Sequence, residues 1–279
     1  MKNFLIPTFP SNTIGDVLSF AIELGRRNGA RLSGIAADGL FSPAATPIQF
    51  VGEADVAYIQ ARAAENEVES EKLFISHMTA AGAPRLAPEE TGFGFDWIGR
   101  DERGSLSVPE QARAYDVTIV SRRGKDAAPG QAALLDDCLF ESGRPILVVP
   151  PERPQTFGDH IVIAWNASSE TARTVALGSR LLNGAKKITV VETDSSNSTG
   201  PTAAALARNL ARNGLPADFH TTPLAGRSAG QAFLDEAQRL GADILFKGAY
   251  TQSRLRQMVF GGATAHLLSH VTLPMFMAN

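Results

Sequence analysis

The chain has 279 residues, of which 44% are hydrophobic, and its formal net charge is −3. A chain of this length suits one large domain or two ordinary ones, and its core needs neither disulfides nor a metal for stability. The charge argues against a dedicated nucleic-acid-binding protein, because such domains usually carry a basic excess. The single cysteine, Cys138, rules out an internal disulfide and fits a reducing compartment.

The chain begins with a short apolar run that prolines interrupt, a pattern unlike a signal peptide. In the sequence, no segment approaches the roughly 18 consecutive apolar residues that a membrane-spanning helix needs. From these two observations we expect a cytoplasmic protein that binds neither membranes nor nucleic acid.

Short apolar runs in the first half of the chain predict β-strands. The expected strands lie near Phe4–Pro7, Arg31–Ala36, Arg85–Gly92, Val117–Val120 and Ile146–Val149. Between the second and third of them, the segment Gly39–Gly52 is apolar yet contains two prolines. We interpret this segment as an insertion packed over its own domain, an ordinary loop rather than a lid over a pocket.

The second half has the same pattern of short apolar runs between amphipathic stretches. The expected strands lie near Ile161–Trp165, Lys187–Glu192, Phe219–Pro223, Asp243–Lys247 and Leu273–Met277. Ser168 can cap a helix through Leu182, and Ser228 can cap one through Leu240, because a serine hydroxyl accepts early orphan amide hydrogens. Strands that alternate with helices predict a parallel sheet covered on both faces.

The two halves repeat one another. The run NFLIPTFPSNT at Asn3 resembles HIVIAWNASSE at His160, and YDVTIVSRRG at Tyr115 resembles ADILFKGAYT at Ala242. The proline-rich run VPPERPQTFGD joins the halves, and prolines favour extended linker conformations. We therefore expect two domains, 1–151 and 152–279, with a boundary near Glu152.

Ligands of open parallel sheets bind beyond the carboxyl ends of the strands. In the second half this edge includes the segment Gly248–Gly262, after which a helix beginning near Gly261 would offer unpaired amide hydrogens. From Ile244 onward the sequence has no acidic side chain, whereas Lys247, Arg254 and Arg256 are basic. The sequence therefore predicts a positively biased edge that suits a phosphate.

The spacing Gly248-x2-Thr251-x9-Gly261-Gly262 resembles the G-x2-G-x9-G-(S/T) signature of the universal stress protein family. The C-terminal run GADILFKGAYTQSRLRQMVFGGATAHLLSHVTLPMFM is similar to that family throughout, as are VIAWNASSE and CLFESGRPILVVP. The resemblance covers both halves. It implies an α/β fold of two tandem doubly wound five-stranded parallel-sheet domains, adenine nucleotide α-hydrolase-like. It also implies that they pair through their last strands, Ile146–Val149 and Leu273–Met277.

The resemblance further implies that the second domain holds ATP, ADP or AMP, with magnesium if the ligand is ATP. The implied nucleotide-binding residues are Asn166, Gly248, Thr251, Arg254, Gly261, Gly262, Ala263 and Thr264. Three of them depart from the family pattern. Thr251 replaces a glycine, Gly262 replaces a hydroxyl donor that Thr264 could supply instead, and Asn166 replaces an acidic residue.

The first half departs further from the pattern. Phe9 stands at the position of Asn166, and Ser121 stands at that of Gly248. We also expect Asp136 and Asp137 near a helix start, where they would repel a phosphate. The sequence thus predicts that the second half alone keeps a nucleotide site.

The family resemblance favours a stress-response regulatory protein that binds a nucleotide without efficient turnover, with slow ATP hydrolysis at most. One alternative is a ligand-free scaffold in which the halves pair and chains form homodimers. A second alternative is a serine hydrolase, because the run GRSAG around Ser228 matches a nucleophile elbow. Its base would be His266 or His270. Its acid would be Asp235, Glu236 or Asp243. The HLLSH spacing of the two histidines also suits metal ligands, although no third ligand is evident.

Overall fold

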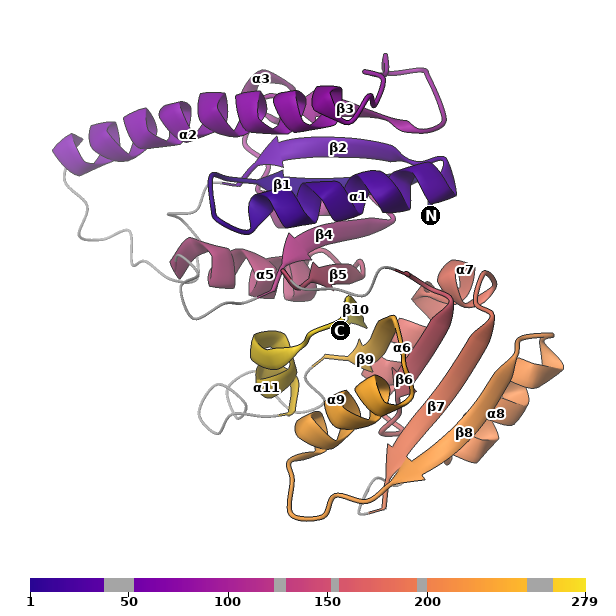
Figure 1. The fold of residues 1–279 in the computed structure, drawn as a ribbon. Coiled ribbons are helices and arrows are strands. Elements are labelled where there is room, and N and C mark those ends of the chain that lie inside the picture. The colour runs from indigo at the N-terminus through magenta and orange to yellow at the C-terminus, as the bar shows by residue number, and fades with distance from the viewer. Residues whose placement is uncertain (38–52, 123–128, 152–155, 195–199, 250–262) are drawn as a thin grey trace. The chain divides into compact units, whose positions relative to one another are not determined.

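The computed structural model describes residues 1–37, 53–122, 129–151, 156–194, 200–249 and 263–279 (Figure 1). Contacts divide the chain into two compact units, Met1–Arg144 and Pro145–Asn279. The sequence-based boundary near Glu152 lies after strand β5 (Ile146–Val149), whereas the contacts assign this strand to the second unit. The reason is its pairing with β10 (Met275–Ala278), the last strand of that unit.

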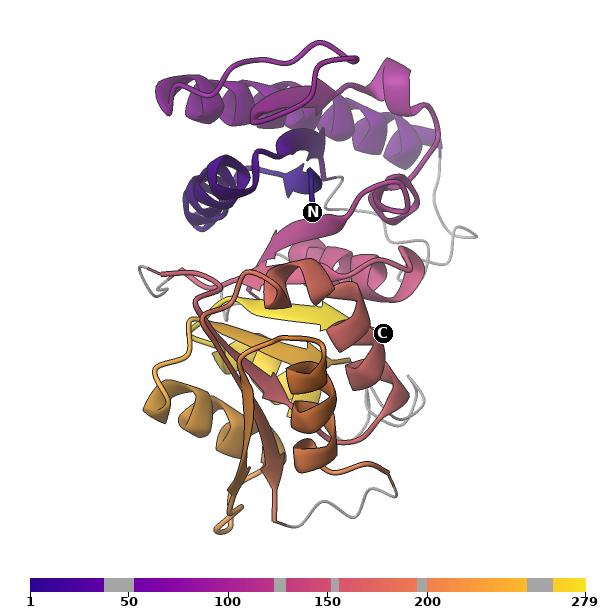
Figure 2. The ribbon, with the colours of Figure 1, turned by 90° about the vertical axis from the view of Figure 1, so that its right-hand side faces the viewer.

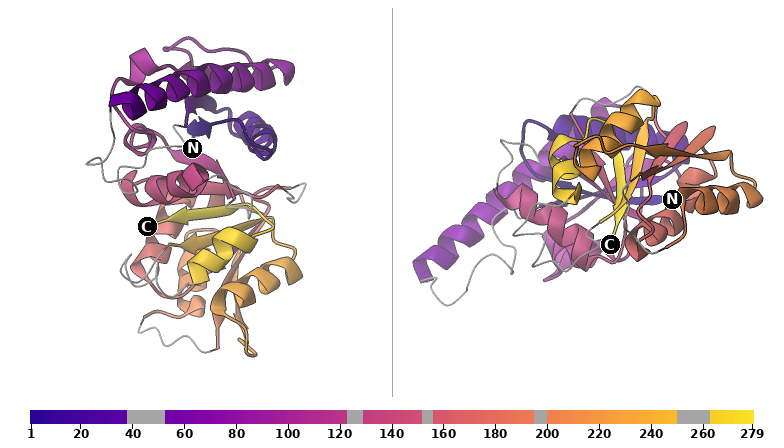
Figure 3. Two further views of the ribbon diagram at one scale, coloured as in Figure 1. Left: turned by 90° about the vertical axis from the view of Figure 1, so that its left-hand side faces the viewer. Right: turned by 90° about the horizontal axis from the view of Figure 1, so that it is seen from below.

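The first unit contains a parallel sheet with the strand order β3-β2-β1-β4. Its elements are β1 (Asn3–Thr8), α1 (Ile14–Asn28), β2 (Arg31–Ala36), α2 (Glu53–Ala80), β3 (Gly94–Ile98), α3 (Arg100–Arg103), α4 (Val108–Ala112), β4 (Val117–Ser121) and α5 (Pro129–Glu141). The amino-terminal part of α2 extends beyond the strands of its own unit (Figure 3). The insertion expected at 39–52 lies outside the described residues.

The third strand does not lie where the sequence pattern put it. The expected range Arg85–Gly92 is wrong, and β3 follows it, because Phe95, Trp97 and Ile98 are the side chains that become buried. Of the expected range, Arg85 alone forms an isolated bridge, with Phe95. The packing of Phe74 from α2 against Phe95 and Trp97 explains this position.

The second unit contains the strand order β5-β10-β9-β6-β7-β8. Its further elements are β6 (His160–Ala164), α6 (Ser169–Leu177), α7 (Ser179–Leu182), β7 (Lys187–Thr193), α8 (Ala203–Arg212), β8 (Ala217–Thr222), α9 (Ala229–Arg239), β9 (Ile244–Gly248) and α11 (Ala263–His270). Neighbouring strands from β10 to β8 run parallel, and β5 pairs antiparallel with β10. Helices α6 and α8 cover one face, and α9 and α11 cover the other (Figure 2). The predicted doubly wound fold and the pairing of the two last strands are confirmed.

Local signals set several boundaries in this unit. The hydroxyls of Ser168 and Ser228 accept backbone hydrogens at the starts of α6 and α9, so both predicted caps are confirmed. The helix expected through Leu182 is interrupted at Gly178, where a β-carbon would lie 2.2 Å from the Phe246 ring. This close approach lets the helix pack against the stacked rings of Phe246 and Phe276. Burying each such ring stabilises the fold by about 1.5–3 kcal/mol.

In each unit, an aspartate accepts hydrogen bonds from backbone amides at the start of the first strand. In the second unit the buried Asp243 accepts hydrogen bonds from the amides of Gly158, Asp159 and His160 at 2.9, 3.0 and 3.2 Å. In the first unit Asp116 accepts them from Lys2 and Asn3. Both aspartates lie at the amino ends of their sheets, immediately before β9 and β4. The internal repeat therefore conserves this contact.

Across the described ranges, none of the helices combines the length and the apolar character needed to cross a bilayer.

Candidate ligand site at the carboxyl edge of the second unit

The predicted nucleotide residues fall into two groups. Asn166 follows β6, Gly248 ends β9, and Ala263 and Thr264 lie in the first turn of α11. The others lie outside the described residues: Thr251, Arg254, Gly261, Gly262 and the neighbouring Arg256. The described members thus come from three separate segments at the carboxyl edge of one sheet.

Asn166 is held at the amino terminus of α6. Its Oδ1 atom accepts a hydrogen bond from Oγ1 of Thr171 at 2.7 Å and a longer one from the amide of Ser168 at 3.4 Å. The side-chain nitrogen of Asn166 has no partner among the residues that the structure describes. An amide fixed through its oxygen still has two hydrogens to donate.

Gly248 is required by packing as well as by its place in the motif. A β-carbon there would lie 2.3 Å from the Thr171 nitrogen and 2.6 Å from the Glu170 carbonyl carbon. The end of β9 therefore touches the first turn of α6, to which Asn166 is also bonded. Through Thr171, two of the predicted site residues are brought close together.

The sequence pattern suggested that Lys247 adds a positive charge to the exposed edge, but the structure buries this residue. Its side chain is buried, with 3% exposure, and its Nζ donates a hydrogen bond to the Gly248 carbonyl at 3.0 Å. Burial lowers the pKa of this amine to about 8, while the nearby Glu170 carboxylate acts in the opposite direction. The positive bias expected at this edge therefore depends on the two arginines outside the described residues and on the α11 dipole.

A pocket of about 270 Å³ opens at the carboxyl ends of β6, β7 and β8. Residues that line it include Trp165, Asn166, Glu192, Thr193, Asp194 and Thr221. Ligand sites in proteins typically enclose about 300–1,000 Å³ and combine an apolar wall with a few placed polar groups. The volume and the mixed lining suit a group of roughly nucleoside size.

A hydrogen bond, a left-handed backbone conformation and a close contact define the wall of the pocket. Trp165 is buried, and its indole Nε1 donates a hydrogen bond to the Pro201 carbonyl at 2.7 Å. Ala167 has a φ of 58°, a left-handed conformation that costs an alanine about 1–2 kcal/mol. The same alanine touches Gly200, where a β-carbon would lie 2.7 Å from its own. Such strain is often found at binding sites.

Two acidic residues of the pocket, Glu192 and Asp194, were not among the site residues that the sequence predicted. The Glu192 carboxylate accepts the amide hydrogen of Ala203 at 2.7 Å, and Asp194 accepts that of Leu224 at 3.0 Å. The available signal was the run ETD directly after a predicted buried strand. The pattern could not reveal that backbone amides of α8 and of the loop after β8 lie close enough to orient the two carboxylates by hydrogen bonds.

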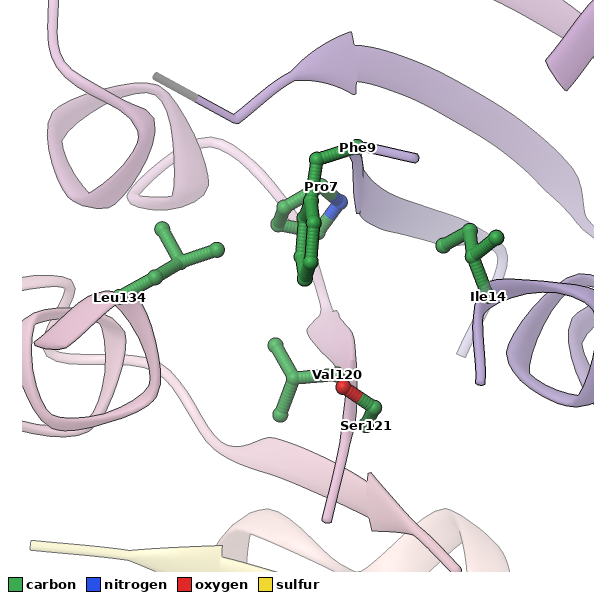
Figure 4. Close-up of a pocket in the computed structure, with 6 residues that line it drawn as sticks. All are labelled: Pro7, Phe9, Ile14, Val120, Ser121 and Leu134. Carbon is green, nitrogen blue, oxygen red and sulfur yellow. The ribbon is translucent and has the colours of Figure 1, made fainter. Parts of the chain in front are cut away.

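In the first unit, the cavity at the carboxyl ends of β1 and β4 is small. It measures about 10 Å³ and is lined by Pro7, Phe9, Ile14, Val120, Ser121 and Leu134. Figure 4 shows the Phe9 ring beside Pro7, pointing into the space between Leu134 and Val120. The sequence placed Asp136 and Asp137 near a helix start, and this prediction is wrong. Helix α5 already begins at Pro129, so both residues lie in its second half. The apolar filling, rather than these carboxylates, distinguishes this edge.

The residues of the hydrolase alternative make other contacts. Ser228 caps α9 by accepting the amide hydrogen of Gln231, whose side-chain oxygen bonds with Nε2 of His266 at 2.7 Å. In the described part of the chain, no hydrogen bond joins Ser228 to a histidine. Asp243 serves the amino end of the sheet, far from the carboxyl edge on which a nucleophile elbow lies.

The remaining candidates are the two histidines proposed as metal ligands and the single cysteine. The His266 and His270 rings stack with centroids 4.3 Å apart, and no group of three or more metal-binding side chains occurs within the described ranges. Cys138 is fully buried, as the sequence suggested, and this burial raises the pKa of its thiol.

No protein-family model matches the chain, and no curated protein does either. Solved structures do match. A universal stress protein from Archaeoglobus fulgidus DSM 4304 is 14% identical, with 99% of this chain and 96% of that chain covered and a TM-score of 0.66. A functionally unknown protein from Pseudomonas aeruginosa PAO1 is 14% identical, with 100% and 92% covered and a TM-score of 0.53. At such identities the likeness shows the fold, which matches the one that the sequence resemblance implied.

Proposed function

We propose that this chain is a tandem universal stress protein whose second unit binds an adenine nucleotide in a stress-related regulatory role. The full-length match to the Archaeoglobus fulgidus protein and the glycine motif support the family and the role. The observation that carries the binding proposal is the open, polar pocket at the carboxyl edge of the second unit. In the first unit, the described cavity beside Phe9 is mostly apolar and measures only about 10 Å³.

The nucleoside end of the ligand fits the pocket. Its wall includes Trp165 and its rim includes Asn166, whose amide hydrogens can be donated to a base or ribose acceptor. Glu192 and Asp194 disfavour an anion there, because like charges repel in a partly desolvated site. The phosphates therefore extend away from these two carboxylates.

The phosphates point toward Gly248 and the amino terminus of α11. The helix begins at Ala263 and offers early amide hydrogens and the positive end of its dipole. Thr171 contacts both Asn166 and Gly248, so the pocket and the end of β9 adjoin. Arg254, Gly261, Gly262 and Thr264 complete the proposed phosphate site, and magnesium accompanies ATP. Thr251 replaces the second glycine of the motif.

Isothermal titration calorimetry of the full chain with ATP, ADP and AMP tests the proposal. We expect Asn166→Phe, which copies the first unit, to weaken binding by about tenfold or more, because it fills the pocket and removes a polar contact. The reciprocal change Phe9→Asn should leave the affinity unchanged. Gly261→Val should also weaken binding, because its side chain would obstruct the approach of a phosphate to the backbone.

The contradicting result is an absence of heat at millimolar nucleotide for the unmodified chain. Mass spectrometry of protein purified from cells gives a second readout, in which a co-purified nucleotide argues against the ligand-free scaffold. Thermal melts of each variant establish that loss of binding does not reflect unfolding.

A further inference from the structure

Glu192 lines the pocket and uses only one of its two carboxylate oxygens in a described hydrogen bond. It lies at the end of β7, is half-buried and lines the pocket. One carboxylate oxygen, Oε2, accepts the amide hydrogen of Ala203, the first residue of α8. The other oxygen, Oε1, has no hydrogen-bond partner in the part of the chain that the structure describes. The carboxylate is thus oriented by one contact and retains an acceptor for another.

The neighbouring lining has the same acceptor character. Asp194 uses Oδ1 to accept the Leu224 amide hydrogen, and its second oxygen has no partner among the described residues. Thr193, between the two acids, is 7% exposed, and its hydroxyl has no hydrogen bond to any described residue. No lysine, arginine or histidine occurs among the described residues that line the pocket. A ligand that carries hydrogen-bond donors therefore suits this wall.

The ribose is a part of the nucleotide that meets this requirement. Phosphates carry no donor and are repelled by the two carboxylates. The 6-amino group of adenine donates from a single atom, whereas a ribose presents two hydroxyls on adjacent carbons. A carboxylate can accept from both, because its two oxygens provide several lone-pair directions. In other parallel sheets that bind nucleotides, an acidic residue near the second strand binds ribose hydroxyls, and β7 is the second parallel strand of its unit.

We propose that Glu192 accepts hydrogen bonds from the 2′- and 3′-hydroxyls of the bound nucleotide, so that the second unit selects ribonucleotides over 2′-deoxyribonucleotides. This inference rests on the proposed nucleotide binding and names the group that gives it sugar specificity. Asp194 lies close by in sequence and provides a further acceptor on the same wall.

The test compares ATP with 2′-deoxy-ATP by titration calorimetry on the full chain. A hydrogen bond to a charged group contributes enough that 2′-deoxy-ATP should bind about tenfold more weakly or worse. Glu192→Gln should weaken ATP binding more than 2′-deoxy-ATP binding and reduce the ratio of the two affinities to about threefold or less. Glutamine keeps an oxygen for the Ala203 amide, so the start of α8 should persist, which a thermal melt checks.

Asp218→Asn is the matched control. It removes the same charge from the same unit, but Asp218 lies near the amino end of β8 and does not line the pocket. The ratio of the ATP and 2′-deoxy-ATP affinities of Asp218→Asn should equal that of the unmodified chain.

The outcomes separate the inference from the function on which it rests. Equal affinities for ATP and 2′-deoxy-ATP, or a ratio that Glu192→Gln leaves unchanged, would overturn the role of Glu192 while nucleotide binding stands. Displacement of ATP by a diamine such as putrescine would assign the carboxylates to a cationic ligand and also overturn it. A chain that binds no nucleotide would refute the proposed function itself, and this inference with it.

Discussion

After the first strand, one unit has Phe9 and the other has Asn166, and the carboxyl edges of the two sheets differ accordingly. At the first edge, a cavity between β1 and β4 measures about 10 Å³ and is lined mostly by apolar side chains, whereas the second edge has a polar pocket of about 270 Å³ at the ends of β6, β7 and β8. At its amino end, in contrast, each sheet has an equivalent aspartate that accepts hydrogen bonds from backbone amides at the start of the first strand. The two repeats therefore share the amino-end contact and differ at the carboxyl edge, where an apolar side chain stands in one and a polar side chain in the other.

Lys247 provides the largest expected difference between the units, because its counterpart in the first unit is the apolar Val120. Lys247→Met should raise the free energy of unfolding at pH 7 by on the order of 3 kcal/mol, since one pKa unit corresponds to about 1.4 kcal/mol. Below pH 8 the amine is protonated in both states, so its burial carries the full penalty. Between pH 8 and 10.5 the unfolded chain binds more protons, and the stability of the unmodified chain rises with pH.

Urea unfolding of both proteins at pH 7 and pH 10 measures this effect. The difference between the unmodified chain and Lys247→Met should shrink at the higher pH. Val120→Met is the control in the first unit and should show a difference that does not depend on pH. A Lys247→Met difference that stays constant across this range would mean that the buried amine is not the cause.

The two amino-end aspartates should differ in the size of their contributions. Asp243→Asn should lower the free energy of unfolding by about 2 kcal/mol, because a buried acceptor of three amide hydrogens loses its charge and presents hydrogens to them. Asp116→Asn should cost about 1 kcal/mol, because this carboxylate is less buried than that of Asp243. Chemical denaturation gives both values. Equal losses would indicate that burial does not govern the strength of this contact.

The smallest expected effect concerns the strained backbone of the pocket wall. Ala167→Gly should stabilise the chain by less than about 1 kcal/mol, because relief of the left-handed strain is partly offset by the greater entropy of glycine in the unfolded chain. Ala225, with a φ of 47°, lies in the loop after β8 and provides the matched substitution Ala225→Gly. Thermal melts compare the two. A clear destabilisation by Ala167→Gly would show that its methyl group contributes packing that outweighs the strain.

Much of the fold could be predicted because its signals are local. The strands at Arg31–Ala36 and Ile146–Val149 have the predicted bounds, and Ser168 and Ser228 cap helices through neighbouring amides. The third strand was misplaced because its position depends on Phe74, a residue of a preceding helix. The interruption at Gly178 likewise depends on two rings from distant strands.

The candidate site could be predicted only in part. The repeat indicated that Asn166 and Phe9 occupy equivalent positions, and that the second unit therefore differs from the first. Glu192 and Asp194 were not predicted as site residues, because their orientation depends on amides of Ala203 and Leu224, which follow in separate elements. Lys247 was expected at an exposed edge and is buried instead, since its neighbours along the chain do not reveal how it packs.

The sequence by itself determined the two-fold repeat, the alternation of strands and helices, and the end of each sheet at which a ligand would bind. These features follow from apolar periodicity and from short-range capping, which a linear sequence contains in full. Only the tertiary structure decided where the polar pocket lies, that Gly248 is required by the close approach of α6, and that two carboxylates are aligned by backbone amides. These features depend on contacts between residues far apart in the chain, and such contacts exist only after the sheet has assembled.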